Sequence, residues 1–591
     1  MFLRTFLPLI SSDLGGYFAY SPIITSVLRN LKHLRVLSFS HYAITKLPEF
    51  LCELIHLRSL DLSHTAIKKL PSRICSLYNL QTLLLSSCCD LSELPAKIRN
   101  LINLRHLVLH GTKLRKMPPE LGKLQNIHVL TDFYVGKDSG SRISELGKLS
   151  HLRGTLSISK LEYVVDARDA LEVDLKSKNY LTGLNFIWTS DNVQNARDVL
   201  DNLRPPEDLK MLTIENYNGT GFSNWLGDVN FSNMVFLRLS KCKNCAYLPP
   251  LGQLSSLQEL CIEGMDGLEI LHSGFYGNGH DGFEPFKSLK TLRLEKLPDW
   301  KYWMPFANEG VVFPSLQELK IQGCPNFIGN LPKHLHSLKE LRLHCMDALD
   351  ILLDDLLEGN SCLQLLEIVD CLRIPFPGGN CLNFVETLWI ENSCDSLVSL
   401  PLGLFTKIQN IHIGKCQNLK TLSIPDQLHV DLTSLREIAI FHCPNLESFP
   451  EQGLPTPSLQ ALYITNCNTL KPSKEWGLHK MVALTCFEIK GGCSDVGSFP
   501  EEGFLPTTLT SLRISRLPNL KFLDKGLQEL TSLEKLEINY CEELALIPSE
   551  GLPASLYYLH IRNCPLLVPR CKKDQGEDWP KISHISSIQI D

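Results

Sequence analysis

The stretch from residue 54 to residue 74 reads LIHLRSLDLSHTAIKKLPSRI, and the spacing of its apolar residues decides the fold. Leu57, Leu60 and Leu62 have the spacing of a short strand that buries alternate side chains, and Leu54 precedes them. The pair Leu70–Pro71 marks the return arm toward the next strand. The stretch therefore predicts one coil of a chain that repeats the same unit.

The same unit recurs along most of the chain. Strand leucines at positions 37, 60, 83, 107 and 130 follow one another at intervals of 23, 23, 24 and 23 residues. This period and the L-x-x-L-x-L spacing are those of leucine-rich repeats, in which each coil packs only on its neighbours. We expect an α/β leucine-rich-repeat solenoid, a horseshoe with a parallel β-sheet on the concave face and short helices or 3-10 turns on the convex side.

Changes in spacing suggest five regions. They are an N-terminal remnant or cap at 1–30, regular repeats at 31–135, longer strand–helix repeats at 136–206, irregular repeats at 207–568 and a C-terminal capping repeat at 569–591. In the longer repeats we expect two helices. One, capped by Asp166, has Ala167, Ala170, Leu171 and Leu175 on one face, and the other has Val193, Ala196, Val199, Leu200 and Leu203. The glycine-rich stretch 272–286 is interpreted as a surface loop.

The cysteines follow the repeat. Of the 21 in the chain, eight stand just after a strand, where the repeat takes Asn or Cys: Cys242, Cys324, Cys371, Cys416, Cys443, Cys467, Cys541 and Cys564. We expect buried, reduced thiols at these turns rather than a disulfide framework. Cys242-x-x-Cys245 has metal-like spacing, but no second pair follows at zinc-finger distance, so we expect no metal.

Composition and motifs narrow the function. The net charge of -6 and the pI of about 6.4 give no reason to expect a nucleic-acid partner. No stretch has the apolar length of a membrane span, and the N-terminus lacks the apolar core of a secretory signal. P-loop, metalloprotease, serine-hydrolase and kinase motifs are missing from the sequence, so we expect no enzyme and no catalytic residue.

The residue between the two apolar residues of each strand should point out of the concave face, so these residues form one column. The column has a basic section followed by an aromatic one, and its candidate protein-binding residues are Arg238, Arg293, Lys320, Arg342, Trp389, His412, Tyr463 and Arg513. Such a composition is typical of protein-binding surfaces. The alternative for the basic section is that Glu259, Glu318 and Glu340 neutralise it in surface ion pairs worth about 0–1 kcal/mol each.

Three segments carry a family resemblance: LRGTLSISKLEYVVDARDALEVDLKSKNYL at 152–181, NWLGDVNFSNMVFLRLSKCKNCAYLPPLGQLSSLQELCIEGMDG at 224–267 and EDWPKISHI at 577–585. With the Leu-Pro return arms, they resemble the leucine-rich-repeat region of plant coiled-coil NB-ARC leucine-rich-repeat disease resistance proteins. The resemblance implies an intracellular immune receptor. Its repeats would bind a pathogen effector or a modified host protein, or contact the NB-ARC module, and would restrain a nucleotide switch in the defence response.

That switch would lie in an NB-ARC module, which this sequence does not contain. We therefore expect this chain to hold no cofactor, to bind neither ADP nor ATP, and to be located in the cytoplasm, with the nucleus as a further compartment. We also expect association through the first coil, with Leu34, Leu37 and Phe39, because residues 1–30 look like a poor lid.

Two alternatives to the immune receptor remain open. One is a generic intracellular leucine-rich-repeat scaffold or ubiquitin-ligase adaptor, which an F-box-like helical segment before the first repeat would favour. The other is an extracellular receptor ectodomain. It predicts many glycosylation sequons, whereas only Asn218-Gly219-Thr220 and Asn230-Phe231-Ser232 fit.

Overall fold

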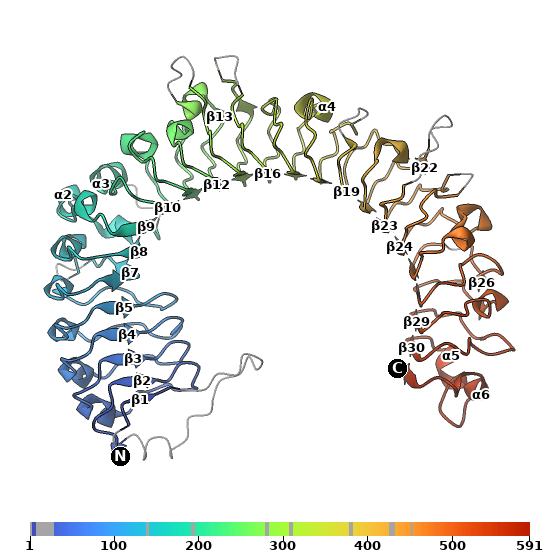
Figure 1. The fold of residues 1–591 in the computed structure, drawn as a ribbon, viewed down its shortest axis with the longest axis horizontal. Coiled ribbons are helices and arrows are strands. Elements are labelled where there is room, and N and C mark those ends of the chain that lie inside the picture. Colours follow the sequence, from blue (N-terminus) through green and yellow to red (C-terminus); the bar gives the residue numbers. More distant parts are fainter. Residues whose placement is uncertain are drawn as a thin grey trace. The chain divides into compact units, whose positions relative to one another are not determined.

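The structure is a computed structural model. It describes residues 3–7, 29–137, 141–190, 195–277, 283–306, 311–377, 382–424, 432–450, 453–493 and 495–591. The chain forms two compact units, unit 1 at 1–315 and unit 2 at 316–591, and each is described by itself. Figure 1 shows their helices and strands, coloured along the sequence. The five-region division expected from the repeat spacing stays a prediction.

Unit 1 begins with a six-stranded parallel sheet, whose strands are β1 (Thr5–Phe6), β2 (Val36–Ser38), β3 (Ser59–Asp61), β4 (Thr82–Leu84), β5 (His106–Val108) and β6 (Val129–Leu130). The strand leucines lie in register, with Leu37 opposite Leu60, then Leu83, Leu107 and Leu130. Strand β1, which the sequence did not indicate, pairs with the outer edge of β2 and places Phe6 opposite Leu37. Residues 8–28 of the expected N-terminal cap lie outside the described residues.

The second sheet of unit 1 is also parallel. Its strands are β7 (Asp132–Tyr134), β8 (Gly154–Ser159), β9 (Leu181–Ile187), β10 (Met211–Glu215), β11 (Phe236–Ser240), β12 (Glu259–Glu263) and β14 (Thr291–Glu295). A two-stranded sheet pairs β13 (Ile270–Leu271) with β15 (Tyr302–Trp303).

Unit 2 contains one long parallel sheet. Its strands are β16 (Glu318–Gln322), β17 (Glu340–His344), β18 (Leu365–Val369), β19 (Thr387–Glu391), β21 (Asn410–Gly414), β23 (Glu437–Phe441), β24 (Ala461–Thr465), β25 (Cys486–Lys490), β27 (Ser511–Ser515), β29 (Lys535–Asn539), β30 (Tyr558–Arg562) and β31 (Ser587–Ile590). Two small sheets pair β20 (Ser399–Pro401) with β22 (Thr421–Ser423), and β26 (Ser498–Phe499) with β28 (Phe522–Leu523).

Short helices lie on the other side of the coils. In unit 1 they are η1 (Glu49–Glu53), η2 (Ser72–Ser76), η3 (Ile98–Asn100), η4 (Leu121–Lys123), η5 (Ile143–Lys148), η6 (Leu161–Tyr163), α2 (Ala167–Leu171), η7 (Leu175–Ser177), α3 (Ala196–Asn202), η8 (Asn224–Gly227), η9 (Leu251–Gln253) and η10 (Ser273–Tyr276). In unit 2 they are α4 (Leu353–Leu356), η12 (Leu402–Leu404), η13 (Lys474–Trp476), η14 (Leu478–Lys480), η15 (Lys525–Leu527), α5 (Leu567–Arg570) and α6 (Trp579–Ile582). The η elements are 3-10 helices.

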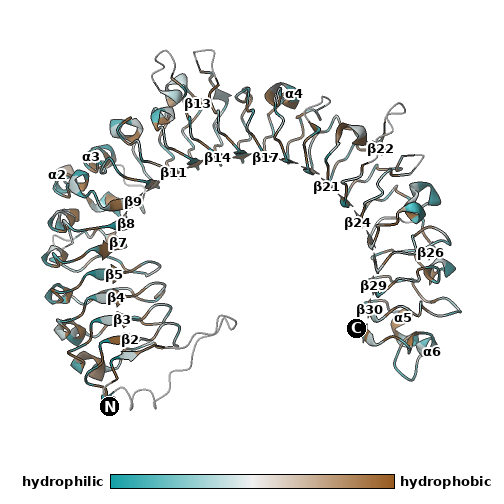
Figure 2. Ribbon diagram, in the orientation of Figure 1, coloured by the Kyte–Doolittle hydropathy of each residue, from teal (hydrophilic) through white to brown (hydrophobic). Residues whose placement is uncertain are grey.

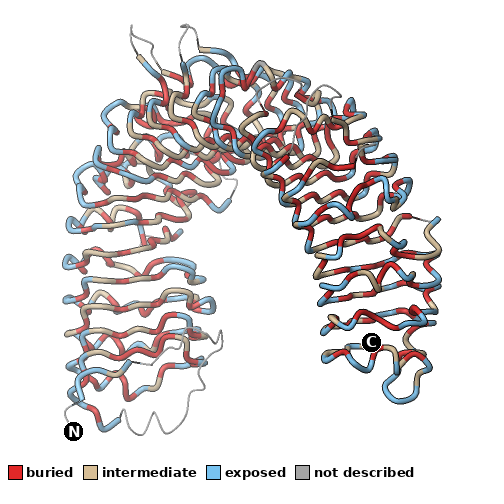
Figure 3. The backbone as a smooth tube through the Cα atoms, turned by 45° about the vertical axis from the view of Figure 1, so that its right-hand side comes forward, coloured by how far each residue is buried: buried red, intermediate tan, exposed pale blue. Residues whose placement is uncertain are grey.

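The core of each coil is the leucine scaffold that the sequence predicts. Alternate strand residues such as Leu60 and Leu62 are fully buried, and the residues between them remain partly open to solvent. Hydrophobic residues recur in each coil (Figure 2), and buried positions alternate with exposed ones along each turn (Figure 3). Parallel strands with short helices opposite them confirm the predicted leucine-rich-repeat solenoid.

The two expected helices form, with differences in detail. The Asp166 carboxylate accepts a hydrogen bond from the Arg168 backbone N–H at 2.9 Å and caps α2 as predicted. The expected shared face is wrong for Leu171, which is exposed because α2 ends there, and Leu175 begins the separate helix η7. Helix α3 buries Ala196, Val199 and Leu200, followed by Leu203, whereas Val193 lies outside the described residues.

The glycine-rich stretch differs from the expected surface loop. Phe275 and Tyr276 at its start and Phe286 at its end are fully buried, and their rings pack together. Aromatic side chains of this size remove a large apolar area from water, which outweighs the local glycine content. Only the middle of the stretch, at 278–282, lies outside the described residues.

The eight turn cysteines are buried, as predicted. The Cys371 thiol donates to the Leu343 carbonyl of the preceding coil at 3.4 Å, and the Cys245 thiol donates to the Gly219 carbonyl at 3.1 Å. The turn cysteine Cys371 and the neighbouring buried Cys245 therefore each link two coils. All 20 cysteines of the described residues are free, and Cys381 lies outside them.

Candidate protein-binding face

Parallel register brings the predicted column together within each unit. In unit 1, Arg238 pairs with Cys261, which pairs with Arg293. In unit 2 the column runs Lys320, Arg342, Glu367, Trp389, His412, Ala439, Tyr463, Glu488 and Arg513. Neighbours in such a column are about 4.8 Å apart. We call the solvent-facing side of these strands the sheet face.

Carboxylates surround the predicted arginines of unit 1. Arg238 Nη2 lies 2.7 Å from Glu263 Oε2, and Arg293 Nη1 lies 3.7 Å from Glu259 Oε1. Lys296 also pairs with Glu263, at 2.8 Å. Glu263 is almost buried, and hydrogen bonds from Lys296 and Arg238 lower the pKa of its carboxyl despite the opposing effect of burial. These two arginines are therefore held by ion pairs within the chain.

Arg342, in the basic section of unit 2, is neutralised in the same way. The Arg342 guanidinium lies 2.7 Å from Glu340, 3.1 Å from Glu367 and 3.3 Å from Glu318. Three coils thus share one cation. Lys320 also has an interaction partner and is not a free cation. The ion-pair interpretation therefore describes the surroundings of Arg342 well. The carboxylates that pair with Arg342 come from its own strand, β17, and from both neighbouring strands, β16 and β18.

An aromatic cluster occupies the middle of the same face. The indole of Trp389 stacks on the imidazole of His412, with ring centroids 4.7 Å apart and planes at 22°. Phe441 adds an edge-on ring with its centroid 6.4 Å from that of Trp389. All three rings are half-buried and come from the successive strands β19, β21 and β23. Phe441 was not among the residues singled out in the sequence, although it occupies an outward position of β23.

Glycine and alanine shape this cluster. A Cβ atom at Gly414 would overlap the Phe441 ring, so the glycine lets that ring approach β21 closely. Ala439 stands between His412 and Tyr463 in the column and has only a methyl group as its side chain. The aromatic side chains of the cluster therefore stand beside two small residues. In the sequence, the short residues 414 and 439 indicate room for large neighbours on the adjacent strands.

Titratable groups at this site are neutral or paired near pH 7. Burial lowers the pKa of His412, and Glu437, whose Oε1 lies 3.8 Å from His412 Nε2, only partly opposes this shift. Burial, with help from the neighbouring Cys486, raises the pKa of Tyr463 to about 12. The cluster consequently presents uncharged aromatic surface.

Arg513 closes the predicted column and is paired on both sides. Its Nε lies 2.8 Å from Glu537 Oε2, and its Nη1 lies 2.9 Å from Glu488 Oε2. These hydrogen bonds raise the pKa of Arg513 and lower the pKa of Glu537. As in the basic section, its positive charge is offset within the chain.

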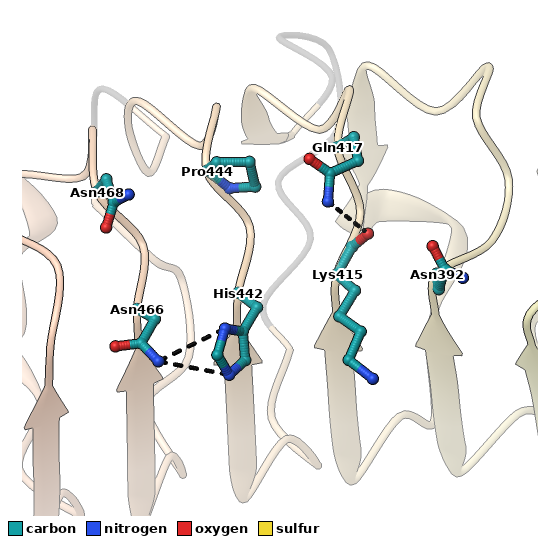
Figure 4. Close-up of a pocket in the computed structure, with 7 residues that line it drawn as sticks. All are labelled: Asn392, Lys415, Gln417, His442, Pro444, Asn466 and Asn468. Carbon is teal, nitrogen blue, oxygen red and sulfur yellow. Dashed lines mark hydrogen bonds between the residues drawn. The ribbon is translucent and has the colours of Figure 1, made fainter.

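A polar depression lies where four of these strands end (Figure 4). It has a volume of about 580 Å³ and is lined by Asn392, Lys415, Gln417, His442, Pro444, Asn466 and Asn468. Asn466 Nδ2 donates toward the His442 ring, 3.4 Å from Nε2, and Lys415 pairs with Glu391 at 2.8 Å. Asn392, Lys415, His442 and Asn466 all have left-handed backbone angles, which turn the chain at each strand end. These residues stand outside the column that the strand pattern predicts.

The fold and the sheet face together define a leucine-rich-repeat protein. The family model R13L1/DRL21 LRRs matches residues 143–265. The chain is 40% identical to the disease resistance RPP13-like protein 1 of Arabidopsis thaliana, over 80% of this chain and 44% of that protein. It is 29% identical to a second Arabidopsis thaliana disease resistance protein, over 100% of this chain and 62% of that protein. It is 31% identical to disease resistance protein RGA2 of Solanum bulbocastanum, over 37% of this chain and 23% of that protein. This leucine-rich-repeat protein is similar to plant disease resistance proteins, which confirms the resemblance inferred from the sequence.

The chain spans about half the length of the first two relatives, 44% of one and 62% of the other. Among solved structures, a TLR13–ssRNA13 complex aligns over 94% of this chain and 81% of that one, at 18% identity and a TM-score of 0.48. A leucine-rich-repeat protein of Leptospira interrogans aligns over 90% and 96%, at 18% identity and a TM-score of 0.35.

Within the described ranges, no cluster of three or more His, Cys, Asp or Glu side chains could hold a metal ion. None of the helices that the structure describes has both the length and the apolar character to cross a membrane.

Proposed function

We propose that this chain is the ligand-recognition and autoinhibitory leucine-rich-repeat region of a plant intracellular immune receptor. It acts in defence by binding a pathogen effector or a modified host protein on the sheet face of unit 2. The observation that carries the proposal is the half-buried cluster of Trp389, His412 and Phe441 on three adjacent strands. Uncharged aromatic surface of this kind provides the central contacts of many protein interfaces.

The charges around the cluster favour a protein over a polyanion at this place. Arg342 and Arg513, on either side of it, are each held by two or more carboxylates of the chain. Binding of nucleic acid depends on free cations that replace counterions along the backbone. A protein partner can instead bury the aromatic rings and leave the flanking ion pairs at the polar rim.

The proposal assigns binding and no catalysis to this chain. ADP or ATP would be held by an NB-ARC module and not by the repeats, and the chain would act in the cytoplasm or the nucleus. Calorimetric titration of the purified chain with ADP and with ATP tests the nucleotide part. A measurable affinity for either nucleotide would contradict it.

The test of recognition uses the chain expressed with a tag in leaf tissue, with and without pathogen challenge. Proteins captured by the wild type are quantified against those captured by Trp389→Ala/Tyr463→Ala. The matched control is Tyr180→Ala/Tyr247→Ala, which removes two exposed tyrosines elsewhere. We expect at least one pathogen-dependent protein to be lost only with the first pair. Equal capture by all three chains, with equal circular dichroism, would contradict the assignment.

A further inference from the structure

A column of arginines runs along the edge of the first repeats, one residue before each strand. Backbone hydrogen bonds join its members from coil to coil. The Arg35 N–H donates to the Arg4 carbonyl at 2.8 Å, Arg58 donates to Arg35 at 2.7 Å, and the chain of bonds continues through Gln81, Arg105, His128 and Arg153. The seven consecutive positions therefore hold five arginines, one glutamine and one histidine. We call this column the arginine ladder.

The ladder is long and open to solvent. Its five arginines are exposed, and neighbouring strands are about 4.8 Å apart, so the six steps from Arg4 to Arg153 extend about 29 Å. This length equals about 19 residues of α-helix at 1.5 Å per residue. A partner segment of ordinary helix length could therefore contact the whole ladder.

These arginines differ from those of the sheet face because no carboxylate in the part of the chain that the structure describes lies within ion-pair distance of them. Among the described residues, no ion pair within 4.0 Å joins Arg4, Arg35, Arg58, Arg105 or Arg153 to an acidic group. The acidic residues of these coils pair with other cations, such as Glu93 with Lys69 and Glu120 with Arg99. The pKa of His106 is lowered, first by its burial and then by the positive charges of His128, Arg153 and Arg105. The positive field of the ladder is thus felt within the protein.

An apolar ridge runs parallel to the ladder. Ile55, Tyr78 and Ile102 occupy one position on three successive coils, three residues before Arg58, Gln81 and Arg105. Their side chains are 45%, 52% and 57% exposed. The side chains of Asn79 and Asn103 donate to the Ile55 and Tyr78 carbonyls at 2.8 and 2.7 Å, which holds the coils of the ridge together. Three exposed apolar side chains in a row make a strip that water solvates poorly.

We propose that the ladder and the ridge together form a docking surface for an amphipathic acidic segment of a partner protein. Carboxylates of the segment pair with the guanidinium groups, for which bidentate geometry is available, while its apolar side chains cover Ile55, Tyr78 and Ile102. The apolar ridge favours protein over nucleic acid, because a phosphate backbone would leave that strip exposed. This surface belongs to unit 1 and is independent of the aromatic cluster of unit 2.

The test measures binding of a fluorescein-labelled synthetic peptide to the full chain by fluorescence anisotropy. The peptide has about 24 residues, with leucines along one helical face and glutamates elsewhere. One comparison peptide has lysine in place of every glutamate, and a labelled single-stranded 20-mer oligonucleotide represents the other class of polyanion. Titrations at low and high salt measure the electrostatic contribution to the binding affinity.

Two variants and a control locate the surface. Arg58→Glu/Arg105→Glu reverses the ladder, and Ile55→Ser/Ile102→Ser removes the ridge. The control is Lys339→Glu/Arg436→Glu, which reverses two exposed cations at the equivalent ladder position in unit 2, where their carbonyls accept the same coil-to-coil bonds. Circular dichroism and thermal melting confirm that each variant folds.

We expect the acidic peptide to bind the wild type and the control alike, and to lose about tenfold or more in affinity with the ladder variant and several-fold with the ridge variant. The lysine peptide should not bind, and affinity for the acidic peptide should fall as salt rises. Absence of acidic-peptide binding would overturn the proposal, as would equal loss with the control. Oligonucleotide binding as tight as that of the peptide, with no effect of the ridge variant, would show a general anion surface and would also overturn it.

Discussion

Trp389 and His412 stack face to face on adjacent strands, with ring centroids 4.7 Å apart. The indole thereby covers one side of the imidazole, and burial is the main cause of the lowered pKa of His412. The same contact holds one face of the indole against its neighbour. A pre-positioned aromatic ring loses less conformational entropy when a partner covers it.

Replacing Trp389 with alanine should raise the pKa of His412 toward its ordinary value of about 6.5, because the imidazole becomes more exposed to water. The measurement is a pH titration of the histidine ring signals by NMR, with His412→Gln to assign the resonance. Tyr463→Phe serves as the control and should leave this pKa unchanged. An unaltered or lower pKa in Trp389→Ala would show that the indole does not shield the ring.

Replacing Gly414 with alanine should displace the Phe441 ring, because the added methyl group would occupy the space of that ring. We expect a loss of about 1–3 kcal/mol in the free energy of unfolding, as for other overpacked sites. Denaturant unfolding measures it. The double variant Gly414→Ala/Phe441→Ala should be less destabilised than the sum of its two single changes, since the overlap no longer exists. Simple additivity would contradict the proposed contact.

The Arg513–Glu537 pair predicts a pH-dependent contribution to stability. Because Arg513 lowers the pKa of Glu537 in the folded state, the contribution is complete above the ordinary pKa of 4.5 and is lost as the pH falls through the lower folded value. Glu537→Gln should therefore destabilise the protein near pH 7 and lose this effect in acid. Unfolding curves from pH 7 to pH 3 test the sign. The exposed Glu543→Gln is the control, and a constant difference at every pH would refute the prediction.

The turn thiols should react slowly while the protein is folded. Burial raises the pKa of Cys371 to about 12 and that of Cys467 to about 11, so little thiolate exists at pH 8. Iodoacetamide followed by peptide mass spectrometry should label the exposed Cys89 and Cys362 first. In denaturant without reductant, nearly all 21 thiols should be counted. Several disulfides, or early labelling of Cys371, would contradict the buried assignment.

The repeats and the turn cysteines could be predicted from sequence because their signal is local. The spacing of Leu57, Leu60 and Leu62 places a strand without reference to any other coil, and a cysteine after a strand needs only that strand to be assigned. The capping role of Asp166 was equally visible, since the cap bonds to a residue two positions further on.

The charge balance of the face could not be predicted in the same way, because it depends on neighbours in other coils. Arg342 stands 24 residues from Glu318 and 25 from Glu367, and only the parallel register brings the three together. The arginine ladder could not be predicted from the sequence for a related reason. Its members stand one residue before each strand and therefore outside the column, which lies between the two apolar residues of the strand. Their lack of carboxylate partners among the described residues is a property of the folded chain.

Phe441 could not be found from the column either, because the column contains only the residue between the two apolar residues of each strand. Phe441 is the fifth residue of β23, two positions after the column residue Ala439, and it reaches Trp389 only across β21. That reach requires the missing side chain of Gly414. The small residue on β21 therefore allows the contact between Trp389 on β19 and Phe441 on β23.

The central claim is that Trp389 and its neighbours bind a protein partner, and its most direct test is the affinity of the purified partner. A protein captured in the leaf experiment is titrated by calorimetry into the wild type, Trp389→Ala/Tyr463→Ala and Tyr180→Ala/Tyr247→Ala. We predict that the first variant weakens binding by a factor of ten or more, at least about 1.4 kcal/mol, while the second variant binds as the wild type does. Equal affinity for all three chains, with unchanged circular dichroism, would contradict the account.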